Sequence, residues 1–151
     1  MRATAEGGLP RRGVPDYGSA MDEKSVVIPK GMERFYEQFH FAPAVKDRNR
    51  LYCSGVIGIG ADGKAAADPE AQFTQAFESL KSVLSTAGAS FPDVIEMTTF
   101  HVGLQAHMLT FMKVKDRYLR APYPAWTAIG ITELAVPGGL VEIKVIASIA
   151  S

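Results

Sequence analysis

The residue types that most often carry catalysis are sparse in this sequence of 151 residues. Its one cysteine, Cys53, lies in a β-rich apolar run without a visible cationic neighbour, so we expect a core position rather than a reactive thiolate. The three histidines, His40, His101 and His107, lack the spacing of metal ligands, and surface or capping roles are expected for the last two. Phosphate-loop, dinucleotide-binding, nucleophile-elbow and zinc motifs are missing from the sequence. The sequence therefore predicts neither a metal site nor a cofactor.

Two side chains have a functional and a structural interpretation, and for Glu142 the functional one comes from the family resemblance given below. The only tryptophan, Trp126, follows a Pro-Ala step in the segment YPAWTAIG, at the start of an apolar run. Its indole would stack on a planar ligand if it lines a cavity, or fill an interface if it does not. Glu142 lies in the last apolar segment. Burial would raise the pKa of its carboxyl and suit it to hold or activate water, whereas exposure would leave a solvated carboxylate.

Composition places these residues in an ordinary soluble domain. Apolar residues make up 47% of the chain and charged residues 21%, and 16 basic residues balance 16 acidic ones. No net field therefore favours nucleic acid or an anionic membrane. A single cysteine excludes an internal disulfide framework and fits a cytoplasmic location. No apolar stretch approaches the roughly 20 residues of a membrane span.

The domain is expected to occupy residues 21–151. Residues 1–20 are rich in Gly, Pro and Arg and show no periodicity, so we interpret them as a leader or disordered extension.

The strongest predicted element is a helix that begins with Asp68 as its N-cap and Pro69 as its first residue. Apolar residues then recur every three or four positions, and Gly88 supplies the stop. The apolar positions are Phe73, Ala76, Phe77, Leu80, Val83, Leu84 and Ala87. A strand at 51–59 is expected before this helix, entering a hairpin at Asp62-Gly63.

The remaining pattern predicts a strand at 94–102, a helix at 107–119, and strands at 125–131 and 140–149. One more short strand is expected between residues 24 and 45. The order β-β-α-β-α-β-β predicts an α+β domain, with two helices on one face of a single sheet.

The second face of this sheet is expected to be too apolar to lie comfortably in water, and burial against sister subunits is the simplest remedy. The residues expected there are Thr98, Phe100, Glu142, Ile146 and Trp126.

Several short sequence segments, taken in their order along the chain, resemble the Rid family. These proteins are the YjgF-like reactive-intermediate deaminases, which are also labelled L-PSP endoribonucleases. The resemblance runs from about Phe41 to Ala150, through LYCSGVIG, QAFESLKSVLSTAG, IEMTTFHV, YPAWT and LVEIKVIA. It implies a chorismate-mutase-like fold with a sheet of about six strands. It also implies a homotrimer with small-molecule clefts between subunits.

The resemblance also implies a chemistry, the hydrolysis of imines and enamines to a carbonyl compound and ammonia. Deaminating members carry an arginine after the Pro-Ala step that binds the substrate carboxylate, and here that position is Trp126. The serine-glycine step is kept as Ser54 and Gly55, and the glutamate thought to orient water is kept as Glu142. The family's asparagine on the second helix falls at Lys115.

Two of these positions have competing readings. Lys115 would replace the lost cation if it meets a substrate anion, although a surface lysine on a helix is the commoner case. Ser54 would hydrogen-bond a ligand, although a serine before a strand glycine is more often structural.

The leading hypothesis is a Rid-like homotrimer that binds a small metabolite and hydrolyses a carbon–nitrogen bond through water held by Glu142. Turnover of 2-aminoacrylate is expected to be weak or absent, with a less anionic or more aromatic substrate preferred. The alternative is a non-catalytic trimer that binds a small ligand or a protein through Trp126. An endoribonuclease is disfavoured by the neutral net charge and the lack of a catalytic His or Lys cluster, so no nucleic-acid partner is expected.

Overall fold

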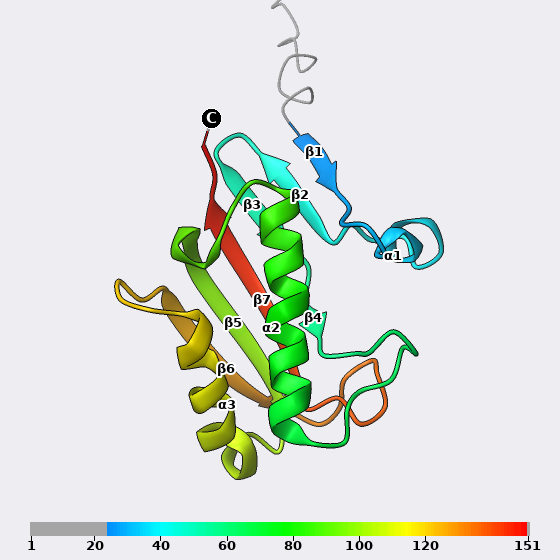
Figure 1. Cartoon of the computed structure of the whole chain (residues 1–151), viewed down its shortest axis with the longest axis vertical. Helices are drawn as coiled ribbons and strands as arrows, with labels where there is room; N and C mark the ends of the chain where they lie inside the picture. Colours follow the sequence, from blue (N-terminus) through cyan, green and yellow to red (C-terminus); the bar gives the residue numbers. More distant parts are fainter. Residues whose placement is uncertain (1–23, 151) are drawn as a thin grey trace, which may run out of the picture.

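A computed structural model describes residues 24–150 as one open sheet with helices against one of its faces (Figure 1). The α+β prediction is confirmed, whereas the expected extension at residues 1–20 lies outside the described part of the chain. The elements are β1 (Lys24–Val27), α1 (Glu33–Glu37), β2 (Ala44–Asp47), β3 (Arg50–Cys53), β4 (Val56–Ile57), α2 (Pro69–Thr86), the 3-10 turn η1 (Phe91–Asp93), β5 (Val94–Val102), α3 (Leu104–Tyr118), β6 (Ala125–Ile131) and β7 (Val141–Ser148).

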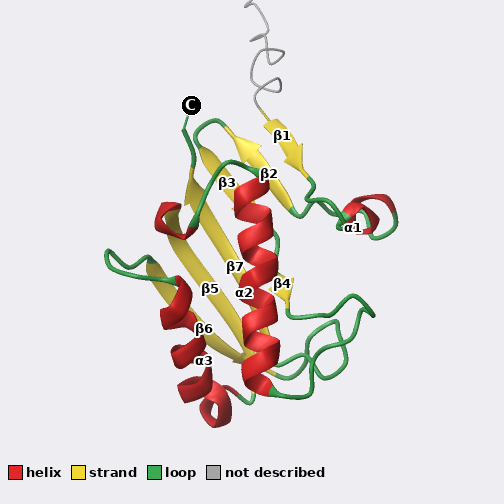
Figure 2. Cartoon of the chain, viewed as in Figure 1, coloured by secondary structure: helices red, strands yellow, loops and turns green. Residues whose placement is uncertain are grey.

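The sheet has seven strands in the order β1-β2-β3-β7-β5-β6, and the short β4 also pairs with β7. All of these pairings are antiparallel except that of β5 with β6, which is parallel because α3 crosses over between them. The last strand of the chain is thus central. Helices α2 and α3 lie side by side across the same face, and α1 lies apart from them beside β2 and β4 (Figure 2). None of the helices within residues 24–150 combines the length and the apolar character of a membrane span.

Helix α2 forms where its capping signals predict. The Asp68 side chain accepts a 2.8 Å hydrogen bond from the backbone N–H of Ala71, and Pro69 is the first helical residue. Gly88 has a left-handed φ of +79°, which ends the helix at little steric cost. The predicted apolar stripe is buried, with Phe73, Phe77 and Leu80 fully enclosed. Local chemistry therefore accounts for this helix.

Three predicted elements differ from the observed ones. Residues 24–45 form two strands and the short helix α1 instead of one strand. Helix α3 begins at Leu104 rather than His107, because Gly103, with φ +67°, turns the chain directly into it from β5. The strand expected at 51–59 is two strands. The backbone N–H of Ser54 bonds to the carbonyl of Pro43 and not to β7, so pairing with β7 is interrupted until Val56.

The core lies between the sheet and α2 and α3. Its aromatic centre joins Phe73 and Phe77 of α2 to Phe111 of α3, with ring centroids 5.5 and 5.8 Å from that of Phe111. The predicted alternation of β7 is confirmed, because its odd-numbered residues are buried and its even-numbered ones are not. The buried residues of β7 are Val141, Ile143, Val145 and Ala147.

The opposite face of the sheet carries Thr98, Phe100, Glu142 and Ile146, as predicted from the strand alternation. The placement of Trp126 on that face is wrong. In the parallel pairing of β5 with β6, Trp126 is in register with buried Met97, so it lies on the helix-covered face. The sequence of β6 does not show which of its side chains face the helices, because the strand is exposed at most of its positions.

The fully buried Gln72 of α2 ties together the loops at this end of the sheet. Its amide group donates to the carbonyls of Ala66 and Gly138, at 3.0 Å each, and accepts from the backbone N–H of Leu140 at 2.6 Å. One side chain thus satisfies three loop backbone groups, which holds the start of β7 in place.

Candidate functional site

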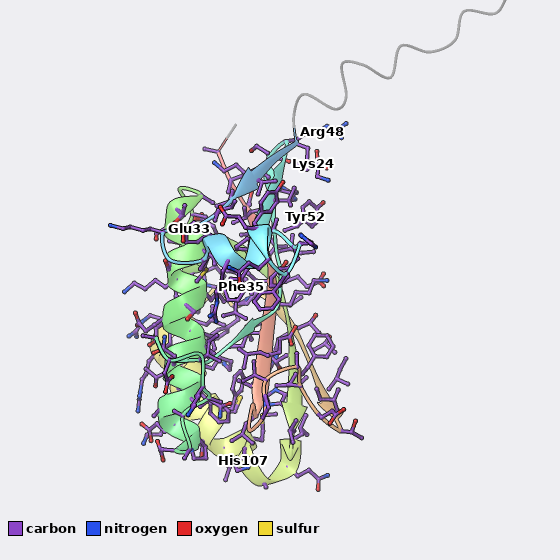
Figure 3. All side chains as sticks on the ribbon, turned by 90° about the vertical axis from the view of Figure 1, so that its right-hand side faces the viewer. Lys24, Glu33, Phe35, Arg48, Tyr52 and His107 are labelled. Carbon is purple, nitrogen blue, oxygen red and sulfur yellow. The ribbon has the colours of Figure 1, made fainter. Side chains whose placement is uncertain are left out.

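A hollow of about 900 Å³ lies beside β4, the short strand that pairs with β7 off the main path of the sheet. Its walls come from α1, the break between β3 and β4, the turn at residues 60–63 and the loop at residues 135–136, and Glu142 lines it from β7. Figure 3 shows Phe35, on the α1 side of this region, well away from His107 at the other end of the molecule. The volume is that of a small-molecule pocket.

Glu142 is the acidic group of this hollow. It is half-buried, and burial raises the pKa of its carboxyl above the ordinary value of 4.5. Within residues 24–150 its carboxylate receives no hydrogen bond and forms no ion pair. The side chain lies directly over Gly55, where a Cβ would overlap its carboxylate oxygen. A partly desolvated carboxylate without a partner is suited to accept a proton from water.

Ser54 and Gly55 share the hollow with Glu142, so three of the predicted site residues are brought together. The hydroxyl of Ser54 donates to the carbonyl of Ala42 at 2.6 Å, and its backbone N–H donates to Pro43. Ser54 therefore stabilises the break between β3 and β4, which is the structural role that the sequence analysis gave as the more common one. Its oxygen keeps lone pairs that can accept a hydrogen bond from a ligand.

We predict that Gly55→Ala lowers activity while leaving the fold intact. The new methyl group must displace the flexible Glu142 side chain from its Cγ outward, and Gly55 has no left-handed φ that would strain an alanine. Displacing a group that acts on the substrate by about 1 Å costs on the order of 10- to 100-fold in kcat/KM, and this is the loss expected if Glu142 is such a group. Steady-state kinetics together with a thermal melt measure the two effects. Full activity in Gly55→Ala would show that the position of Glu142 is irrelevant.

A second hollow, of about 330 Å³, lies at the edge formed by β6 and α3. It is lined by Trp126 and Lys115 together with Tyr123 and Asp116. In one chain it is separate from the first hollow, because β7 and β5 lie between β4 and β6 in the sheet. The predicted site residues thus fall into two groups that a single chain does not bring together.

Trp126 is held from inside the protein. Its indole N–H donates to the hydroxyl of Thr99 at 2.9 Å, and that hydroxyl also lies 2.7 Å from Nε2 of His101. His101 is buried against Phe111, which corrects the surface or capping role expected for it, and burial lowers the pKa of its ring. Because the only polar donor of Trp126 is engaged, the indole offers a ligand its apolar surface alone.

Lys115 is not a surface lysine. Its side chain is 8% exposed and its ammonium bonds to the Asp116 carboxylate at 2.6 Å. The same ammonium lies 5.2 Å from the ring of Trp126 and 5.9 Å from the ring of Tyr123, within cation–π range. Lys115 thus places a positive charge beside Trp126, but the neighbouring carboxylate and the two rings already stabilise that charge.

The first hollow contains functional candidates that the sequence analysis missed. Arg34 of α1 lines it, with its guanidinium carbon 5.5 Å from the centroid of the Phe35 ring. Phe39 and Phe41 extend the aromatic wall, and the Phe35 and Phe41 rings stack at 5.4 Å. The dense aromatic spacing of RFYEQFHF was the available signal, but we interpreted this segment as a possible strand.

The remaining chemical candidates do not form a site. Cys53 is buried in the core as predicted, and burial raises the pKa of its thiol to about 12. His107 is half-buried in α3, edge-on to Phe73. In the described part of the chain, no group of three or more His, Cys, Asp or Glu side chains could hold a metal ion.

Comparisons with known proteins agree with this architecture. The family model described as Endoribonuclease L-PSP matches residues 32–149. The RutC family protein YjgH of Escherichia coli is 38% identical over 130 residues, which are 85% of this chain and 98% of the relative. A solved structure of protein YJGH superposes with a TM-score of 0.79 at 36% identity, covering 85% of this chain and 98% of that chain.

A more distant relative is named for an activity. The 2-iminobutanoate/2-iminopropanoate deaminase of Dermatophagoides farinae is 30% identical over 98 residues, which are 62% of this chain and 74% of the relative.

Proposed function

Since the chain belongs to the Endoribonuclease L-PSP family, the YjgF/RidA group of proteins, we propose that it hydrolyses an imine, an enamine or a related carbon–nitrogen bond of a small metabolite. The observation that carries the proposal is the half-buried, unpartnered carboxylate of Glu142 in a hollow of about 900 Å³. The imine deaminase among the relatives supports this class of substrate.

The reaction needs one carboxylate and one water. An enamine first tautomerises to its imine, and protonation of the imine nitrogen makes the adjacent carbon electrophilic. Glu142 accepts a proton from water as the oxygen bonds to that carbon. The nitrogen then takes up this proton, and the carbon–nitrogen bond breaks as Glu142 accepts the proton of the new hydroxyl group. Ammonia and a carbonyl compound are released, and Glu142 returns this second proton to ammonia or to solvent. One water is consumed and no group is oxidised or reduced, so the proposed reaction calls for no cofactor.

We propose further that the protein acts as a cytoplasmic homotrimer. The exposed face of the sheet carries Tyr52 and Ile129, which are 45% and 42% exposed, together with Phe100 and Ile146. Covering such a face is favourable in water. Head-to-tail contact would also bring the Trp126 and Lys115 hollow of one subunit to the Glu142 hollow of the next. The site would then be complete only in the assembly.

The test is a substrate series. Enzymatically generated 2-aminoacrylate is supplied first and pyruvate release is followed; imines generated by an amino-acid oxidase from larger apolar amino acids come next. We expect little acceleration with 2-aminoacrylate, because Trp126 replaces the arginine of deaminating members, and clear acceleration with larger imines. No acceleration of any imine would refute the function. A rate with 2-aminoacrylate equal to that of an arginine-bearing relative would refute the expected selectivity.

A further inference from the structure

We propose that Arg34 of α1 binds a carboxylate of the substrate in the Glu142 hollow, and that the surrounding aromatic wall selects substrates with a bulky apolar side chain. The inference rests on the proposed function and names the substrate class of the same site. It concerns an element, α1, for which the sequence analysis assigned no functional residue.

Charge is the first argument. Among the described residues that line the hollow, the two with ionisable side chains are Arg34 and Glu142. Arg34 has a ring contact with Phe35, and within residues 24–150 it forms no ion pair or side-chain hydrogen bond. A cation and a carboxylate thus line one cavity without neutralising each other. A molecule that carries both a carboxylate and a protonated imine nitrogen would complement them.

The geometry of Arg34 suits a carboxylate. The guanidinium carbon lies 5.5 Å from the centroid of Phe35, and a terminal nitrogen lies 3.5 Å from the position of a Cβ on Gly63. The group therefore lies between α1 and the turn at residues 60–63. Contact with an aromatic ring restrains the guanidinium while leaving its in-plane N–H groups to donate, and two such groups match the two oxygens of a carboxylate.

The residues that line the hollow favour a substrate with a bulky apolar side chain. Phe35, Phe39 and Phe41 line one side of the hollow, and the β4 residues Val56 and Ile57 line the other. A three-carbon imino acid would leave most of the roughly 900 Å³ that a single subunit offers unfilled. Each additional buried methylene should tighten binding about fourfold.

This assignment changes the reason for the weak turnover expected of 2-aminoacrylate. The substrate would still be an anion, contrary to the less anionic molecule suggested by Trp126 alone. The limiting property of 2-aminoacrylate would be its small size and not its charge.

Binding of 2-oxo acids, the hydrolysis products, tests the proposal independently of turnover. Calorimetry on the full-length protein compares pyruvate with 2-oxo acids bearing isobutyl and benzyl side chains. The parent should bind the larger acids at least about 50-fold more tightly than pyruvate, since three or more additional carbons are buried. Arg34→Gln should weaken binding of the larger acids about 10- to 100-fold, the loss of hydrogen bonds to a charged group. Lys81→Gln, which removes an exposed charge from α2, is the matched control and should bind like the parent.

Each outcome decides one part of the proposal. Unchanged binding of the larger acids by Arg34→Gln would overturn the role of Arg34, and equal parental affinity for pyruvate and the larger acids would overturn the role of the aromatic wall. With imines, Arg34→Gln should raise KM with little change in kcat, and it should not affect uncharged imines of the same side chain. If the parent binds the larger acids but hydrolyses no imine, the proposed function fails and the binding proposal stands.

Discussion

Glu142→Gln should lower kcat/KM for imine hydrolysis at least about 100-fold, because general acid–base groups typically contribute 10²–10⁴-fold to a rate. The amide has nearly the shape of the carboxylate and can still contact a water, but it cannot accept the water's proton. Steady-state kinetics with the best imine of the substrate series measure the change. Parental activity in Glu142→Gln would exclude Glu142 as the proton acceptor.

The pH dependence adds a signature of the same group. The carboxylate must be ionised to accept a proton, so kcat/KM of the parent should rise with pH and level off above the pKa of Glu142. Burial raises that pKa above 4.5, so the plateau should begin at a higher pH than for an exposed glutamate. The residual activity of Glu142→Gln should lack this rise.

Stability provides the control for folding. Because the pKa of Glu142 is higher in the folded state, ionising it costs folding free energy. This cost is absent below the unfolded-state pKa and fully present above the folded-state pKa. Glu142→Gln should therefore melt at a higher temperature than the parent near pH 8, with the difference shrinking as the pH falls toward 4.5. A variant less stable than the parent at pH 8 would mean that the carboxylate has a structural partner.

Phe77→Ala should lower the free energy of unfolding by about 3 to 5 kcal/mol, the typical cost of removing a buried phenylalanine. Phe77 is fully buried on α2, where its ring stacks on Tyr118 of α3 with centroids 4.9 Å apart and planes 9° from parallel. It also contacts Phe91 and Phe111. The contacts come from two separate elements, α3 and η1, so the cavity cannot close without moving a helix. Chemical denaturation at a fixed protein concentration measures the loss.

Leu109→Ala is the matched control for this core substitution. Leu109 is on α3 but 87% exposed, so its removal should change the free energy of unfolding by no more than about 0.5 kcal/mol. Equal losses in the two variants would indicate that Leu109 is buried in an assembly. A loss below about 1 kcal/mol in Phe77→Ala would contradict the described core.

The elements predicted correctly are those that are specified by residues close to one another in the sequence. Helix α2 has a capping aspartate, a first-turn proline, an apolar stripe and a terminal glycine, and each acts through residues no more than four positions away. Strand β7 alternates over eight residues with one face buried, so the side on which Glu142 lies was also predictable. The resemblance of five sequence segments to the Rid family then indicated the fold and the family, both of which are confirmed.

Two of the errors concern features that depend on distant partners. The break between β3 and β4 depends on Ser54 bonding to the chain ahead of β2, about ten residues away. The side of the sheet taken by Trp126 depends on the register between β5 and β6, which α3 separates in sequence. The pattern of polar and apolar residues within one strand does not determine which strand it pairs with or in which register.

The sequence by itself thus determines helix α2, the alternation of the central strand β7 and the face of the sheet on which the Glu142 carboxylate lies. The tertiary structure alone decides the surroundings of that carboxylate. It brings α1 with Arg34 to the same hollow and directs Trp126 to the opposite edge, beneath α3 and beside Lys115. The physical reason is that a capping or periodic pattern acts over a few residues, whereas a cavity is enclosed by segments whose contact requires the whole sheet to form.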